Sequence, residues 1–286
     1  MSKVTRGAAA FGLAAIVALL ITAYGQSLWG LLVLANLRFH PELPWAAPAM
    51  AILLAILILY LAGFGWPRST SVARRRLLRW NPIPLPVFGW AVLTGIMADL
   101  ALGGVWIAVS DLVHIPAGIT PKLSGIPPWT VLSFLIVGSL AAPISEEAAF
   151  RGYAQGLLER AWQWAPAAII GSSLLFAAAH FLQGLSAPKL SLYFLAGLIF
   201  GALAYLTNSL YAAMAVHCAA DLEGFLVLWP HDAHPHALVT AGGHDPLFLP
   251  AVAAVAIFAP LSVLGFVRLA HLRHGEWRGA KLAAAV

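Results

Sequence analysis

The sequence predicts an all-α, polytopic transmembrane helix bundle, and three observations support this fold class. Hydrophobic residues make up 61% of the 286 residues and charged residues only 9%, whereas a soluble domain carries roughly 25% charged residues. Several apolar runs approach or exceed the about 20 residues that a helix needs to cross the hydrocarbon core of a bilayer. The runs are rich in Ala and Leu and lack the alternation of barrel strands. A large soluble helical domain is therefore the weaker alternative.

The apolar runs divide the chain into about eight expected spans, most of them joined by short connections. The first span follows Lys3 and Arg6, and it is either a signal peptide or an uncleaved anchor. Its apolar sequence runs on through Leu28–Leu37, which favours the anchor. We expect the fourth span to continue as an amphipathic helix to about Glu159, and Pro143 can kink it. The expected spans are residues 8–32, 45–65, 87–108, 129–150, 165–182, 190–207, 211–229 and 247–270.

The basic residues predict how these spans are oriented. A net charge of +5 could indicate a nucleic-acid partner in a soluble protein, but here the positive charges flank apolar runs, so no nucleic acid is expected. With both termini cytoplasmic, thirteen of the 16 basic residues lie inside, and only Arg38, Lys122 and Lys189 lie outside. This bias follows the positive-inside rule and favours an even number of spans. The run Arg74–Arg76, with Arg79, is expected to anchor the topology and to contact anionic membrane lipids.

The fourth expected span carries three charged side chains in a place where charge costs several kcal/mol. Glu147 and Arg151 are four residues apart, so on a helix they share a face and can pair. Glu146 points away from that face and has no local partner. A carboxylic acid in such a position suits a general acid or base. The alternative is that both glutamates only brace the packing of helices.

Two histidines follow in later spans. His180 ends the sequence Phe-Ala-Ala-Ala-His, and taken alone a histidine near a helix end is more often structural. His217 and Asp221 are four residues apart, so the carboxylate can orient the imidazole, or both can hold a water or a metal. Two imidazoles and a carboxylate are also a usual zinc set. Glu146, His180 and His217 are thus candidate zinc ligands, and a metal-free site in which Glu146 takes a proton from water is equally open.

The order EExxxR, FxxxH and HxxxD on successive membrane helices resembles the CPBP family of intramembrane proteases. These are the CAAX-protease and bacteriocin-processing enzymes, also called Abi proteins or type II CAAX prenyl endopeptidases. The resemblance covers roughly residues 130–230. It implies that Glu146 activates the hydrolytic water, and that His180 and His217 hold this water or stabilise the oxyanion. Glu147 and Arg151 would organise the site, and Asp221, where relatives carry Asn or Asp, would help to bind the water or the oxyanion.

The resemblance also implies a division of the chain and a function. Residues 1–128 would form three N-terminal spans, residues 129–230 the protease core with spans four to seven, and residues 231–286 an outer His-rich loop, the last span and a basic cytoplasmic tail. The expected function is cleavage of a membrane-associated protein or peptide in a bacterial cytoplasmic membrane, with a divalent metal such as zinc or with no cofactor. The alternatives are a non-proteolytic scaffold or bacteriocin-immunity protein and, less favoured, a transporter, which would show paired half-repeats.

Three further features carry predictions of their own. His180 would lie near the outer end of its span and Glu147 nearer the inside, so they can meet only if the helices are tilted or offset, or if the fourth span extends well past Arg151, which we favour. Asp99 is expected to make an inter-helix polar contact. The outer segment His231–His236, with His244 and Asp245, fits either a divalent-metal site or an ordinary polar loop.

Overall fold

The computed structural model describes residues 3–115, 125–181, 186–233 and 238–283. These residues form helices and, within the described ranges, no strand, which confirms the predicted all-α class. Six helices are long and apolar enough to cross a bilayer, so the chain is an integral multi-pass membrane protein. The helices are α1 (Lys3–Phe39), α2 (Ala46–Leu61), α3 (Ser71–Leu77), α4 (Leu85–Leu112), α5 (Pro128–Glu147), α6 (Gln155–Trp162), α7 (Ala165–Ala179), α8 (Ala187–Thr207), α9 (Tyr211–Glu223), α10 (Trp229–Ala233) and α11 (Phe248–Ala283).

Two of the eight expected spans are shorter than a bilayer core. The helix α2 has 16 residues and α7 has 15. At 1.5 Å per residue these lengths are about 24 and about 22 Å, against about 30 Å of hydrocarbon. The fourth span is longer than a simple crossing, since α5, a π-helical segment and α6 run together over Pro128–Trp162, as the sequence predicts. The number of complete crossings stays a prediction.

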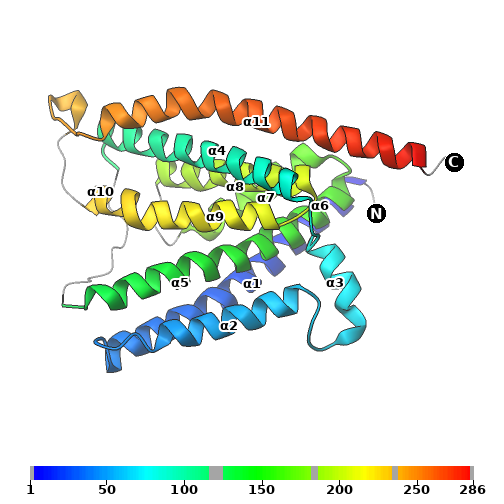
Figure 1. The fold of residues 1–286 in the computed structure, drawn as a ribbon, viewed down its shortest axis with the longest axis horizontal. Helices are drawn as coiled ribbons and strands as arrows, with labels where there is room; N and C mark the ends of the chain where they lie inside the picture. The colour runs from blue at the N-terminus through cyan, green and yellow to red at the C-terminus, as the bar shows by residue number, and fades with distance from the viewer. Residues whose placement is uncertain (1–2, 116–124, 182–185, 234–237, 284–286) are drawn as a thin grey trace.

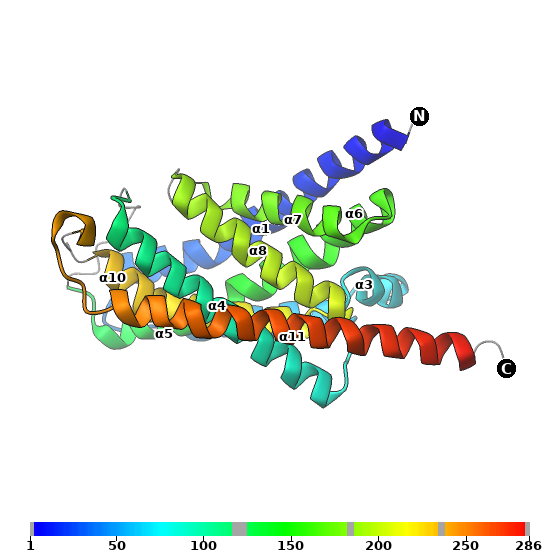
Figure 2. The same ribbon diagram turned by 90° about the horizontal axis from the view of Figure 1, so that it is seen from above.

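The apolar helices alternate in direction along the chain (Figures 1 and 2). The start of α1, the basic helix α3 and the end of α11 lie toward one end of the molecule, at the right of Figure 1. The end of α4, the short α10 and the start of α11 lie at the opposite end. This arrangement brings segments that are far apart in the sequence together at each end, and the side of the membrane that each end faces stays a prediction.

Small residues let the helices approach closely. The helix α4 packs along α11, and a Cβ at Gly265 of α11 would lie only 2.3 Å from Thr94 Oγ1 of α4. Helix association in membranes depends on this kind of close van der Waals contact. The centre of the bundle is filled by fully buried side chains such as Phe150, Leu203 and Val216. Side chains placed there are held among α5, α7, α8 and α9.

Two of the four arginines around α3 are used inside the protein. Arg74 is buried and donates hydrogen bonds to the carbonyls of Tyr60 and Phe64, and Arg79 is buried in an ion pair with Glu159. Arg75 and Arg76 are exposed. The sequence therefore overestimated how much of this cluster is free for lipid headgroups, because long arginine side chains can also fold back onto loop carbonyls.

Candidate active site

The hairpin of α6 and α7 has its turn midway along the chain between Glu147 and His180. The chain turns at Gln163, whose φ of 54° is left-handed, and at Trp164. Glu147 lies sixteen residues before Gln163, and His180 lies sixteen residues after Trp164. The fourth helix extends well past Arg151, as favoured from the sequence. That the two residues lie at one depth stays a prediction.

Glu147 is the central acceptor of the site. Its side chain is fully buried, and its Oε1 lies 2.8 Å from Arg151 Nη1, so the predicted pair is present. The same oxygen lies 2.8 Å from His217 Nδ1. Because a carboxylate paired with arginine only accepts, His217 carries its proton on Nδ1 and presents Nε2 to the other side of the ring. The carboxylate of Glu147 thus orients the imidazole.

Arg151 is fixed on several sides. The guanidinium donates to the carbonyl of Gly197 at 3.3 Å and lies 4.2 Å from the ring centre of Phe176. The close approach of α8 needs a glycine at position 197, since a Cβ there would lie 2.8 Å from Ser173 Cβ. A rigid, buried cation therefore balances the charge of Glu147.

Two further carboxylates face the imidazole of His217. Its Nε2 lies 3.7 Å from Glu146 Oε2 and 3.6 Å from Asp221 Oδ1. Both distances exceed a direct hydrogen bond, so Nε2 makes no direct bond to either carboxylate. Glu146 is anchored by Gln26 of α1, whose Nε2 donates to Oε1 at 2.9 Å. The side chain of Asp221 is 27% exposed, against 8% for Glu146, so the cluster is most open at Asp221.

His180 joins the site through aromatic contacts. Its Nδ1 donates to the carbonyl of Phe176 at 2.8 Å, because a carbonyl can only accept. In the neutral ring, Nε2 is then an acceptor. The ring stacks on Tyr193 at 4.1 Å and lies 4.6 Å from the ring of Phe176, which also contacts the ring of His217 at 5.6 Å. Within the described contacts, His180 makes no direct hydrogen bond to the other five predicted residues.

Two π-helical segments lie at the predicted motifs, and the first of them contains Arg151. Ala148–Ala154 begins after the glutamate pair, and Gly224–Leu228 begins one helical turn after Asp221. In the first, the amide of Gln155 donates to the carbonyl of Phe150, five residues back. Such widened turns are rare and occur often at functional sites. A widened turn rotates the residues that follow it to a different side of the helix. The 3.6-residue period of the sequence does not reveal this rotation.

The comparison with known families addresses the same stretch. Residues 128–222 match the family model described as Type II CAAX prenyl endopeptidase Rce1-like. This segment is Rce1-like. The match confirms the resemblance stated from the sequence, and it covers about a third of the chain, including all six predicted site residues. The comparisons with curated proteins and with solved structures give no match.

The sequence missed Gln26, which lies outside the Rce1-like segment. It is a polar side chain inside the apolar helix α1, and this position was the available signal. Glu223 of α9 lies against α4 at Gly103, one turn after Asp99, which is consistent with the expected inter-helix polar contact of Asp99. Both features show that polar groups inside this bundle face other helices.

The predicted zinc set does not converge as a compact group. Its donor types suit zinc. Among the described residues, however, the side chains that bring three ligand atoms within 4.8 Å of one another are Asp111, His231 and Asp245, and not Glu146, His180 and His217.

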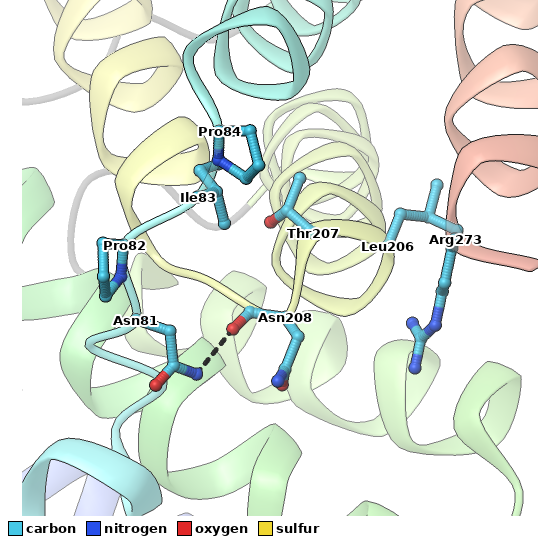
Figure 3. Close-up of a pocket in the computed structure, with 8 residues that line it drawn as sticks. All are labelled: Asn81, Pro82, Ile83, Pro84, Leu206, Thr207, Asn208 and Arg273. Atoms are coloured by element: carbon cyan, nitrogen blue, oxygen red, sulfur yellow. Dashed lines mark hydrogen bonds between the residues drawn. The ribbon is translucent and has the colours of Figure 1, made fainter. Parts of the chain in front are cut away.

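A separate pocket lies away from the predicted site residues (Figure 3). It opens between the loop that precedes α4 and the turn from α8 to α9, where Asn81 Nδ2 donates to the carbonyl of Asn208 at 2.8 Å. Arg273 of α11 closes one side. None of the six predicted site residues lines this pocket, whose walls are Asn81, Pro82, Ile83, Pro84, Leu206, Thr207, Asn208 and Arg273.

Proposed function

We propose that this protein is an intramembrane endopeptidase that hydrolyses peptide bonds of membrane-associated proteins or peptides, in the cytoplasmic membrane of a bacterium. The match of residues 128–222 to a membrane-protease family supports the class of reaction. The observation that carries the proposal is the gap between Glu146, His217 and Asp221. Their facing atoms are separated by 3.7 and 3.6 Å at His217 Nε2, which is longer than a direct hydrogen bond, so these polar atoms stay available to a water held beside them.

In this mechanism Glu146 is the general base. It accepts the proton of the held water as the water oxygen attacks the carbonyl carbon of the peptide. Asp221 accepts a hydrogen bond from the other hydrogen of the water. This bond directs a lone pair of the water oxygen toward the carbonyl carbon. We expect His180 to contact the reacting atoms as well, with Nε2 as an acceptor. When the carbon–nitrogen bond breaks, Glu146 returns the proton to the leaving amine.

The oxyanion of the tetrahedral intermediate needs a fixed donor. In its imidazolium form, His217 donates from Nε2, while its Nδ1–H stays on Glu147 at 2.8 Å. The ion pair between Glu147 and Arg151 keeps that acceptor charged and in place. Glu147 and Arg151 are therefore positioning residues, and Glu146, His217, Asp221 and His180 are the residues expected to touch the reacting atoms.

The test compares new peptide termini in membranes from cells that express the wild type, Glu146→Gln or the control Glu42→Gln at equal levels. Glu42 is an exposed glutamate outside the site. We expect termini that appear with the wild type and with the control, and that are absent with Glu146→Gln. Identical profiles for all three, together with a cellular phenotype that persists in Glu146→Gln, would replace the protease proposal with the scaffold alternative.

A further inference from the structure

A second cluster of buried ionisable side chains lies at the opposite end of the molecule from the chain termini, near α10 in Figure 1. Asp111 comes from the last turn of α4, His231 from α10, and Asp245 from the turn before α11. Their side chains are 0%, 4% and 8% exposed. Segments separated by more than a hundred residues thus bring three potential ligands together.

Three carboxylates face one imidazole in this cluster. His231 Nε2 lies 3.1 Å from Asp245 Oδ2 and 3.5 Å from Asp111 Oδ1. A ring nitrogen carries at most one proton, so it cannot donate fully to both carboxylates. A third carboxylate, Asp232, lies 3.4 Å from Nδ1 on the other side of the ring. Carboxylate oxygens and an imidazole nitrogen are donor types that a divalent transition metal takes as ligands.

The distances match the edges of a metal coordination shell. Zinc binds nitrogen and oxygen ligands at about 2.0–2.2 Å in a tetrahedron, whose edges are then about 3.3–3.6 Å. The two measured separations from His231 Nε2, 3.1 and 3.5 Å, lie close to that range. The three ligand atoms, one from each side chain, all lie within 4.8 Å of one another. A small inward rotation of the carboxylates completes the three ligand positions.

The surroundings also resemble the support that metal ligands receive. A metal-bound imidazole usually donates its other N–H to a carboxylate, which fixes the ring. Here Nδ1 of His231 faces Asp232, and Trp106 Nε1 of α4 donates to Asp232 Oδ1 at 3.1 Å. Asp232 is therefore placed as the outer partner of the ligand His231.

We propose that Asp111, His231 and Asp245 bind a divalent transition-metal cation, for which zinc is the first candidate, with a fourth position open to water. An imidazole ligand disfavours Mg²⁺ and Ca²⁺, which prefer oxygen. The cation would tie the end of α4 to α10 and to the start of α11. It would thereby fix the segment that follows His217 and Asp221 without touching the Rce1-like site.

The test measures metal bound to the purified full-length protein in detergent. Samples are stripped with a chelator, loaded with Zn²⁺ and analysed for zinc content, and a parallel set is loaded with Co²⁺ and examined for the visible absorption of a four-coordinate site. The ligand variants are His231→Gln and Asp245→Asn. The matched control is His244→Gln, which alters an exposed histidine beside Asp245.

We expect the wild type and His244→Gln each to bind one equivalent of zinc, and we expect both ligand variants to lose it. The cobalt absorption should be present and absent in the same proteins as the zinc. Asp232→Asn should bind about 10–100-fold more weakly. The same comparison in a Glu146→Gln background removes any contribution from the Rce1-like site.

The proposal would be overturned by equal zinc content in the wild type, His231→Gln and Asp245→Asn, provided that circular dichroism and size exclusion show all three proteins to be folded. Asp245 precedes α11 and lies in no helix, so its variant tests the site even if a helix variant fails to fold.

Discussion

Two histidines in this protein sit between carboxylates, and they differ in what balances the negative charge. At His217, Glu147 is paired with Arg151, which is buried and held by Gly197 and Phe176. At His231, the described ion pairs run from Asp111, Asp232 and Asp245 to the imidazole itself. The first cluster has a cation built into the chain, and the second is suited to a cation from solution. Similar sets of carboxylates around a histidine can therefore be balanced either by a permanent arginine of the chain or by a metal ion that can be removed.

The largest effect is expected when the built-in cation is removed. Arg151→Met leaves Glu147 buried without a compensating charge, and breaking a buried pair in this way costs about 3–5 kcal/mol. Thermal unfolding in detergent should show a large loss of stability. The double variant Glu147→Gln, Arg151→Met removes both charges and should recover part of the loss. An Arg151→Met protein as stable as the wild type would mean that Arg151 does not balance Glu147.

The next effect concerns the rate and leaves the fold intact. Glu146→Gln removes the general base, so turnover of a cleaved substrate should fall about 10²–10⁴-fold. The amide oxygen still accepts from Gln26, whose bond to Glu146 is 2.9 Å long, so the unfolding temperature should stay near that of the wild type. A variant that keeps its rate would exclude Glu146 as the base, and one that unfolds would show that its role is structural.

A smaller effect distinguishes the removable cation from the built-in one. A ligand present at a hundred times its Kd stabilises a protein by about 2.7 kcal/mol. A chelator should therefore lower the unfolding temperature of the wild type, and it should leave that of Asp245→Asn unchanged. If the chelator acts equally on both proteins, the cation that it removes is bound elsewhere.

The smallest effect is expected at Gln26. Gln26→Leu removes one hydrogen bond to Glu146, worth about 0.5–1.5 kcal/mol, so turnover should fall by about tenfold or less. Ser27→Ala, at an exposed neighbour on α1, is the control and should leave turnover unchanged. A loss as large as that of Glu146→Gln would move Gln26 from a supporting residue to a catalytic one.

The contacts of the site that the sequence could predict join residues that are close together in the chain. Glu147 and Arg151 are four residues apart, and helical periodicity alone places them on one face. The bonds from Glu147 to His217 and from Gln26 to Glu146 join residues 70 and 120 positions apart. Periodicity shows which face of a helix is polar, but it does not show which other helix covers that face.

The same limit applies to the fold and to the second cluster. The apolar runs predicted the positions of the helices, whereas the end of α7 at Ala179, before the expected end of its span at residue 182, had no signal in the apolar pattern. His231 and Asp245 were recognised as possible ligands, but Asp111 closes an apolar span and gave no local signal. His234 and His236, from the same predicted loop, lie outside the described residues. Untested roles of the six site residues stay predictions.

The shortness of α7 has a consequence for the surrounding lipid. A segment of about 22 Å beside a hydrocarbon layer of about 30 Å creates a hydrophobic mismatch, which a bilayer relieves by thinning locally. Thinning on this flank brings headgroups and water closer to His180, the residue at the end of α7. The energy of this deformation grows with membrane thickness, so turnover is expected to decline as the acyl chains of the host bilayer lengthen.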